Sequence, residues 1–373
     1  MEFEVVLVGI DASRAMRAQR TGTENYSLQL IRHLLALGSD HRFWLYSDRV
    51  PPAGLFGTEV CPELRVIPFP RLWTHIRLSW EMLRRPPDVL FIPAHVLPLI
   101  HPHRSVVTVH DLGYLYYPEA HTRWQRAYLH WSTRWNVRQS THIVVDSEAT
   151  KADLAERYRV PPEKMAVVYP GRDETLRPVA DPAMLAAVRV RYGLGERYIL
   201  HVGTLQPRKN LLRLVEAFAR IGDKGVQLVL AGKRGWLAEP LFRRVEELGL
   251  SQAVRFLGYV EEADLPALLS GAACFAFPSL YEGFGFPVLE AQACGAPVVA
   301  SNVSSIPEVA GDGALLVDPH DTAALAQAMA RVLSDETLRA ELIARGLANV
   351  QRFSWRRCAE QTLAVLERVG SQR

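Results

Sequence analysis

Short apolar runs alternate with segments of helical periodicity along the whole chain. The runs predict strands over residues 3–10, 42–47, 64–69, 89–93, 105–111 and 141–147, and then over 197–204, 226–232, 253–259, 273–279, 296–301 and 314–319. Helical patterns, such as those of 24–38, 211–222 and 322–335, fill the gaps between them. Continuous apolar strands separated by helices are typical of parallel sheets whose faces helices cover. The pattern therefore predicts an α/β protein with doubly wound sheets.

One segment without periodicity divides the pattern in two. Residues 167–182, VVYPGRDETLRPVADP, are rich in proline and aspartate, which is typical of a linker. A chain of 373 residues is also too long for one ordinary core. We expect one domain over 1–170, a second over 171–353, and a C-terminal helix over 354–373 that packs back toward the first. Ligands would bind in a cleft where the carboxyl ends of both sheets meet.

Charge and composition exclude several classes of protein. The formal net charge of +3 is too small for a nucleic-acid-binding protein, although residues 65–138 hold ten arginines against four acidic residues. The N-terminal apolar run is too short for a signal sequence, and no run of 18 apolar residues occurs, so we expect a cytoplasmic protein. The cysteines match no metal-binding spacing and are predicted to be buried thiols; they are Cys61, Cys274, Cys294 and Cys358.

The segment 278–297, PSLYEGFGFPVLEAQACGAP, contains the most informative pattern. Gly283 and Gly285 precede a predicted helix, so backbone amides can approach a ligand closely there. The helix N-terminus offers partial positive charge to a diphosphate. Glu282 and Glu290 are eight residues apart across this junction, and each could accept hydrogen bonds from sugar hydroxyls. The alternative is that one glutamate caps the helix and the other is solvated.

A pair of cations lies in the segment 201–218, HVGTLQPRKNLLRLVEAF. Arg208 and Lys209 follow a predicted strand and precede a helix that Asn210 could cap. Two cations at a helix N-terminus oppose its dipole, so their presence favours an anion between them and the amides. The alternative is a merely exposed basic pair.

These segments resemble a known family. EGFGFPVLE is similar to the E-x7-E motif of the family 4 retaining glycosyltransferases, and EAQACGAPVVAS and HVGTLQPRKN also resemble it. The resemblance covers most of the chain and is densest over 197–335. It implies the GT-B fold, with two Rossmann-like domains, and transfer of a hexose from a nucleotide diphosphate sugar with retention of configuration. The segment GTLQPRKN is most similar to that of mannosyltransferases that use GDP-mannose, with UDP-glucose-type donors as the alternative.

The resemblance also implies roles for individual residues. Glu282 would contact the transferred hexose, Glu290 the donor ribose, and Arg208 and Lys209 the diphosphate leaving group. His110, at the end of a strand, would lie beside the transferred sugar, although a strand-end histidine is otherwise more often structural. His95 is a weaker candidate. The implied donor-binding residues are Gly22 in a loop over 19–30, Gly203, Arg208, Lys209, Gly258, Tyr259, Glu282, Gly283, Phe284, Gly285 and Glu290.

The sequence also leads to expectations about metals, cofactors and the acceptor, and it leaves two alternative functions open. No DxD sequence lies at a strand end, so we expect no metal and no cofactor, with Arg208 and Lys209 stabilising the leaving group instead. The first domain would bind a saccharide or lipid-linked acceptor that the sequence does not identify. A nucleotide-sugar epimerase of GT-B architecture is the competing enzyme, and a non-catalytic sugar- or nucleotide-binding module is a further alternative.

An aromatic stripe occurs in the residues 121–139. Trp124, Tyr128, Trp131 and Trp135 recur at helical spacing, with arginines between them. The favoured interpretation is that the stripe packs into the core of the first domain. The alternative is that it joins the basic, aromatic segment 71–85 in contacting anionic lipid at the inner face of a membrane.

Overall fold

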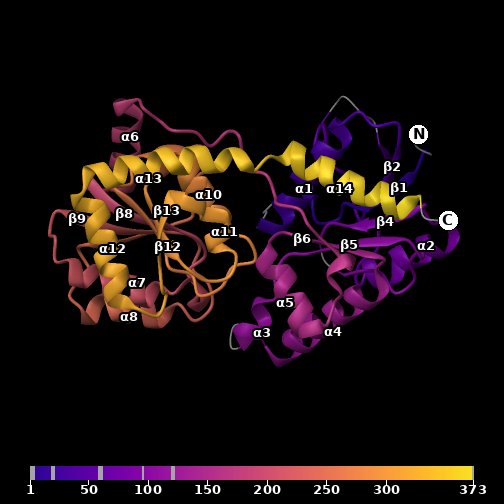
Figure 1. The fold of residues 1–373 in the computed structure, drawn as a ribbon, viewed down its shortest axis with the longest axis horizontal. Helices are drawn as coiled ribbons and strands as arrows, with labels where there is room; N and C mark the ends of the chain where they lie inside the picture. Colours follow the sequence, from indigo (N-terminus) through magenta and orange to yellow (C-terminus); the bar gives the residue numbers. More distant parts are fainter. Residues whose placement is uncertain (1–4, 18–21, 58–61, 95, 119–121, 372–373) are drawn as a thin grey trace. The chain divides into compact units, whose positions relative to one another are not determined.

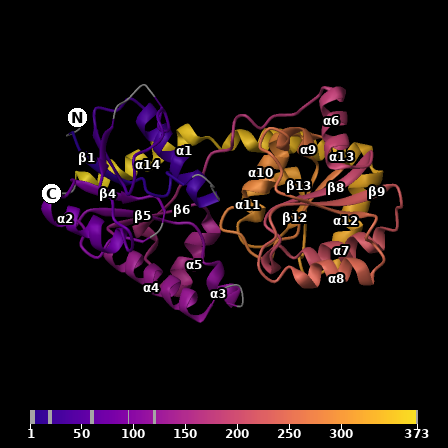
Figure 2. The same cartoon turned by 180° about the vertical axis from the view of Figure 1, so that it is seen from behind.

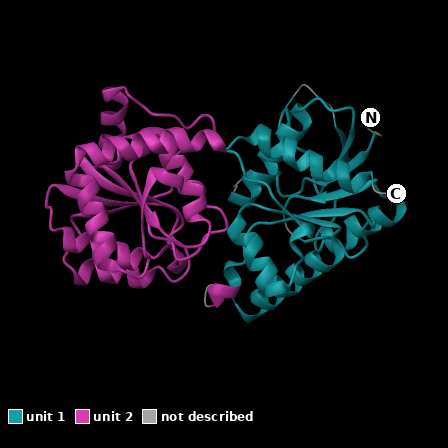
Figure 3. Cartoon of the chain, in the orientation of Figure 1, with its two compact units in different colours: residues 1–114, 121–171, 353–373 teal, residues 115–120, 172–352 magenta. Residues whose placement is uncertain are grey.

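The computed structural model describes residues 5–17, 22–57, 62–94, 96–118 and 122–371. The chain forms two compact units, coloured separately in Figure 3. The first comprises residues 1–114, 121–171 and 353–373, and the second comprises 115–120 and 172–352. Each unit is built around its own parallel sheet (Figure 1).

The first unit contains a seven-stranded sheet in the order β3-β2-β1-β4-β5-β6-β7, with every neighbouring pair parallel. The central strands are buried along their whole length, as their continuous apolar sequences require. The order reverses between β1 and β4, which makes this the switch point of the sheet. The strands are β1 (Leu7–Asp11), β2 (Arg42–Ser47), β3 (Glu63–Val66), β4 (Val89–Ile92), β5 (Ser105–Val109), β6 (His142–Val145) and β7 (Met165–Val167).

Helices cover both faces of this sheet (Figures 1 and 2). The C-terminal helix α14 (Trp355–Gly370) packs against α1 (Gly22–Ala36), and Gly370 lies so close to Val6 that a Cβ there would clash with it at 2.7 Å. The other helical segments associated with this part of the chain are η1 (Thr74–Leu78), α2 (Ser79–Arg84), α3 (Gly113–Tyr116), α4 (Arg123–Gln139), α5 (Glu148–Tyr158) and η3 (Pro162–Lys164).

The second unit contains a six-stranded sheet in the order β10-β9-β8-β11-β12-β13, again with parallel neighbours throughout. Its order reverses between β8 and β11. The strands are β8 (Arg197–Val202), β9 (Val226–Ala231), β10 (Val254–Gly258), β11 (Cys274–Phe277), β12 (Val298–Ser301) and β13 (Ala314–Val317).

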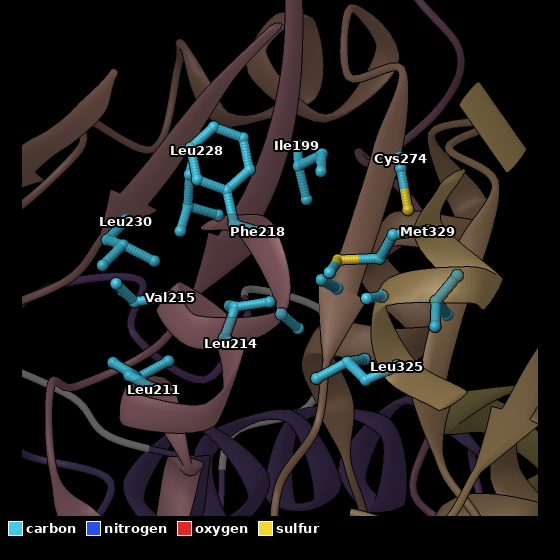
Figure 4. Close-up of a cluster of buried hydrophobic side chains, with 14 of the residues drawn as sticks. Ile199, Leu211, Leu214, Val215, Phe218, Leu228, Leu230, Cys274, Leu325 and Met329 are labelled. Carbon is cyan, nitrogen blue, oxygen red and sulfur yellow. The ribbon is translucent and has the colours of Figure 1, made fainter. Parts of the chain in front are cut away.

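A hydrophobic core joins one face of the second sheet to its helices. Leu214 and Phe218 of α7 (Leu211–Ile221) pack with Leu228 of β9 and Met329 of α12 (Thr322–Ser334) (Figure 4). The strong apolar face of α7 accounts for this position, because burying it removes apolar area from water. The remaining helical segments are α6 (Pro182–Tyr192), η4 (Pro207–Lys209), α8 (Glu239–Glu247), α9 (Leu265–Ser270), α10 (Phe286–Ala293), α11 (Ile306–Ala310), η5 (Gly311–Gly313), α13 (Glu336–Asn349) and η6 (Val350–Arg352).

The structure confirms the predicted α/β class with two doubly wound parallel sheets. All twelve predicted strands are present, with their ends shifted by a few residues. β7 was missed, because three residues are too few to show a period, and Val167 was wrongly assigned to the linker. The helix predicted over 24–38 is confirmed as α1, which begins at Gly22, so the loop predicted over 19–30 was wrong from that residue onward. The three cysteines within the described ranges, Cys274, Cys294 and Cys358, are buried and free, and Cys61 lies outside those ranges.

Candidate functional site

The predicted donor-binding residues of the second unit gather at the switch point of its sheet. η4, which carries Arg208 and Lys209, follows the carboxyl end of β8, and the loop with Glu282 follows the carboxyl end of β11. These two strands are neighbours in the sheet, so their ends meet. Ligands of doubly wound sheets bind at this place, because adjacent loops diverge there toward opposite faces.

A compact ion cluster occupies this position. Lys209 Nζ donates to Glu282 Oε1 at 2.6 Å, and Arg208 Nη1 donates to Glu282 Oε2 at 2.8 Å. Lys209 and Glu282 are buried. Burial alone raises the pKa of the Glu282 carboxyl, but the charges of Lys209 and Arg208 outweigh it and lower the pKa to about 2. Two cations against one carboxylate leave the cluster with an excess positive charge.

The structure corrects two interpretations of the sequence, namely the exposed basic pair and the helix cap by Asn210. Lys209 is not part of an exposed basic pair, and the anion that both cations contact is the carboxylate of Glu282. Asn210 precedes α7 in a left-handed conformation (φ 58°), but its side chain makes no cap hydrogen bond. Its amide donates instead to the carbonyl oxygen of Pro319. Asn210 therefore ties the cation-bearing turn to the segment after β13.

Gly203 makes room for the lysine. A Cβ at Gly203 would lie 3.5 Å from Lys209 Cε and 3.3 Å from His201 Nε2. His201 is fully buried, and its Nδ1 donates to the carbonyl oxygen of Ala276. Burial lowers the pKa of His201 to about 4, so the imidazole is neutral and Nε2 is an acceptor beside the path of the lysine. A side chain at position 203 would crowd His201 Nε2 and would have to adopt the positive φ of this residue (152°), which side chains rarely do.

The loop around Glu282 is held from the segment after β12. The Glu282 amide donates to Ser304 Oγ at 2.9 Å. Ser305 Oγ lies 2.9 and 2.6 Å from the carbonyl oxygens of Glu282 and Phe284, which share its single proton. Gly285 precedes α10 at φ 113°, and a Cβ there would lie 2.8 Å from Ile306. Gly283 and Phe284 are buried within the loop. The loop is therefore pre-organised at the N-terminus of α10.

Glu290 lies one turn inside α10 and is half-buried. Burial raises the pKa of its carboxyl to about 7, with the charge of Asp173 adding to the shift and that of Lys209 opposing it. Glu290 is thus within electrostatic range of the ion cluster, yet its protonation differs from that of Glu282. Perturbed carboxyls at the end of a sheet are typical of functional sites.

The other predicted donor-binding residues of this unit lie at the same edge of the sheet. The carbonyl oxygen of Gly258, at the end of β10, accepts a hydrogen bond from the amide of Gly232, after β9. Gly232 in turn approaches Gly203 so closely that a Cβ on it would lie 1.9 Å from the Gly203 carbonyl oxygen. Tyr259 is exposed, with Lys233 Nζ 5.3 Å from its ring centroid. An exposed aromatic ring at this edge could stack on a nucleotide base.

In the first unit, His110 is held by two hydrogen bonds. Its Nδ1 lies 2.6 Å from Asp146 Oδ2, and its Nε2 lies 3.0 Å from the carbonyl oxygen of Pro93. A carbonyl can only accept, so Nε2 carries a proton. Burial lowers the pKa of His110, but the Asp146 carboxylate outweighs burial and the net direction is upward. The ring packs edge-on against Tyr26 at 4.7 Å between centroids.

Of the two remaining candidates of this unit, Gly22 and His95, only Gly22 lies within the described residues. Gly22 is the first residue of α1 and is exposed, and His95 lies outside the described residues. Asp11, at the end of the switch-point strand β1, was not singled out from the sequence. It is buried and accepts a hydrogen bond from the Ser13 amide, and burial raises the pKa of its carboxyl to about 6.

Asp146 and His201 were also missed by the sequence reasoning. Strands β5 and β6 are parallel neighbours with Val109 opposite Val145, so the residues that follow, His110 and Asp146, lie side by side. A pair of polar residues at successive strand ends was the signal for Asp146. For His201, the signal was a polar residue between the apolar residues Leu200 and Val202 inside a strand.

Comparison with known proteins adds independent information. The family model described as Glycosyltransferase Family 4 matches residues 20–176, and that described as Glycosyl transferases group 1 matches residues 189–348. The chain is 35% identical over 264 residues to the O-antigen chain mannosyltransferase B of Escherichia coli, an alignment that covers 70% of this chain and 69% of that protein. It is 37% identical over 176 residues to the serotype-specific mannosyltransferase WbdA of Escherichia coli, covering 46% of this chain and 22% of that protein.

A solved structure of the same fold extends over both units. The complex of Anabaena HepE with UDP-glucose gives a TM-score of 0.76 at 20% identity, covering 97% of this chain and 99% of that one. Such a likeness shows the fold, and it agrees with the predicted GT-B type. The matched family models and the Escherichia coli relative of 35% identity establish that this chain belongs to the family 4 glycosyltransferases.

Proposed function

We propose that this glycosyltransferase moves mannose from GDP-mannose to a hydroxyl group of a saccharide or lipid-linked acceptor, with retention of anomeric configuration. The observation that carries the proposal is the Glu282–Arg208–Lys209 cluster at the switch point of the second sheet. The names of the Escherichia coli relatives support mannose as the sugar. UDP-glucose-type donors remain the alternative.

The cluster suits the chemistry of donor cleavage. Negative charge builds on the departing diphosphate while the anomeric carbon becomes cation-like. Lys209 is buried and Arg208 is half-buried, and Glu282 holds both, so they can stabilise that charge with little reorganisation. Glu282 keeps both cations oriented and is placed at the loop where the hexose would bind. We assign Glu290, deeper in α10, to the ribose hydroxyls of the donor.

His110 of the first unit stays a prediction for contact with the transferred sugar. Its Nε2 proton is engaged by Pro93, so a sugar hydroxyl would have to compete for it. Asp146 holds the ring and favours its protonated form. Retention would follow if the acceptor attacks on the face from which the diphosphate departs.

Thermal-shift measurements with nucleotide sugars test the donor. A ligand at 100 times its dissociation constant adds about 2.7 kcal/mol to the free energy of unfolding, so GDP-mannose should raise the melting temperature by several degrees more than UDP-glucose does. Incubation with GDP-mannose and candidate hydroxyl acceptors should then release GDP. Stabilisation by UDP-glucose alone would overturn the donor assignment. Epimerisation of the sugar without transfer would favour the epimerase.

We also expect catalysis without a divalent cation. Arg208 and Lys209 place fixed positive charge where metal-dependent transferases use a metal ion, so EDTA should change the rate of GDP release by less than about twofold. The measurement compares initial rates before and after dialysis against the chelator. A collapse of the rate that manganese or magnesium restores would show that the leaving group is stabilised in another way.

A further inference from the structure

Three of the four rings in the aromatic stripe of α4 face outward, contrary to the favoured interpretation of the stripe as part of the core. The fourth, Trp135, is half-buried and its Nε1 donates to the carbonyl oxygen of Leu97. Trp124, Tyr128 and Trp131 are 88%, 39% and 41% exposed. The buried residues of this helix are instead Ser132, Thr133, Asn136 and Val137, which lie on the opposite side. Asn136 anchors that side, because its Oδ1 accepts a hydrogen bond from the Leu97 amide at 2.9 Å. The helix therefore buries its small polar side and exposes its large aromatic one.

A second apolar segment adjoins the stripe. Ile76, Trp80 and Leu83 recur at spacings of four and three residues along η1 and α2, and all three are exposed. His75 joins this segment to α4. Its Nε2 lies 3.1 Å from the Tyr128 hydroxyl, and its ring centroid lies 5.7 Å from that of Trp131. The two segments thus form one surface, which we call the aromatic–basic face; its apolar members are Leu72, Ile76, Trp80, Leu83, Trp124, Tyr128 and Trp131.

The charge around these residues has one sign. Residues 123–139 contain four arginines and no acidic residue, and residues 71–85 contain four arginines and one glutamate. That glutamate, Glu81, is buried and paired with Arg65 and Arg77. The exposed arginines of the two segments are Arg71, Arg84, Arg85, Arg123, Arg126, Arg134 and Arg138.

We propose that the aromatic–basic face docks this enzyme on an anionic membrane surface. Tryptophan and tyrosine rings favour the boundary between headgroups and acyl chains, and arginines beside them are attracted to anionic lipids. A uniformly negative surface matches a face whose exposed charges are all positive. Within the described ranges, no helix has both the length and the apolarity that a bilayer span requires, so this contact would be peripheral.

Flotation with lipid vesicles tests the docking. The wild-type chain should float with phosphatidylcholine vesicles that contain phosphatidylglycerol at low salt, and much less with phosphatidylcholine alone or at 0.5 M salt. Replacing Arg123, Arg134 and Arg138 with glutamine should weaken partitioning about 100-fold, since each arginine near the surface contributes about fivefold. Trp124→Ser should also reduce it, and this side chain is 88% exposed, so its removal should leave the fold intact.

Matched controls lie on the second unit. Arg220, Arg243 and Arg255 are exposed arginines there, and Trp236 is an exposed tryptophan. Their replacement by glutamine and serine should leave flotation at the wild-type level. No flotation of the wild-type chain, or equal losses in the control variants, would overturn the proposal. Binding of a single-stranded oligonucleotide without vesicle binding, lost in the Arg123–Arg134–Arg138 variant, would assign the face to nucleic acid instead.

Discussion

Replacing Lys209 with alanine is expected to weaken binding of GDP about 10- to 150-fold and to slow transfer by a similar factor. A charge-assisted hydrogen bond is worth roughly 1.5–3 kcal/mol, which corresponds to that range of affinities. Because Lys209 is buried and paired with Glu282, the variant should also lose stability, by about 1–3 kcal/mol. This loss follows from the structure, since a lysine on an exposed loop would have none.

The two losses can be separated. Combining Lys209→Met with Glu282→Gln removes the buried carboxylate charge together with its buried lysine partner and leaves only the half-buried Arg208 without its carboxylate, so the free energy of unfolding should recover in part while GDP binding stays weak. Lys224→Ala is the matched control, because Lys224 is an exposed lysine in the same unit and should change neither quantity. Calorimetric titration with GDP and urea denaturation measure the two effects. Wild-type affinity in Lys209→Ala would remove this residue from the donor site.

The two glutamates are expected to respond differently to substitution by glutamine. Glu290→Gln should weaken binding of GDP by about 10- to 150-fold, because its proposed contacts with the ribose exist before and during reaction. Glu282→Gln should lower kcat on the order of 100-fold and should not weaken GDP binding, since it frees Arg208 and Lys209 to meet the diphosphate. Calorimetric titration with GDP, followed by kinetics with the full donor, distinguishes them.

Protonation gives an independent measurement of the Glu290 assignment. Its pKa is raised to about 7, and hydrogen bonds from two hydroxyls favour the ionised form, so GDP binding should lower that pKa and release protons near pH 7. The affinity for GDP should therefore rise as the pH increases through 7. The apparent binding enthalpy should also depend on the ionisation enthalpy of the buffer, and Glu290→Gln should abolish both effects. Affinity losses of equal size in both glutamine variants, or a loss confined to Glu282→Gln, would show that the two roles are misassigned.

Local sequence patterns predicted most of the strands and helices. The buried strands have continuous apolar sequences and stand between amphipathic helices such as α7, so their positions follow from backbone geometry and burial of side chains. Strand β7 was not predicted, because an edge strand of three residues is too short to show a period. The position in the core predicted for the aromatic stripe of α4 was wrong for a different reason. Helical spacing shows that aromatic residues share one side, but it does not show whether that side meets the protein or the solvent.

The sequence by itself determined the α/β class and the presence of Glu282, Arg208 and Lys209 at the ends of strands, since these depend on short stretches of chain. Only the tertiary structure decided which strand ends are neighbours. The pairing of β8 with β11 brings Arg208 and Lys209 against a glutamate more than 70 residues later, and the pairing of β5 with β6 sets Asp146 against His110. Strand order arises from the packing of whole sheets and helices, so no local pattern encodes it. Burial raises the pKa of both Glu282 and Glu290, and the tertiary pairing of Glu282 with Arg208 and Lys209 separates its low pKa from the raised pKa of Glu290 on the same loop–helix junction.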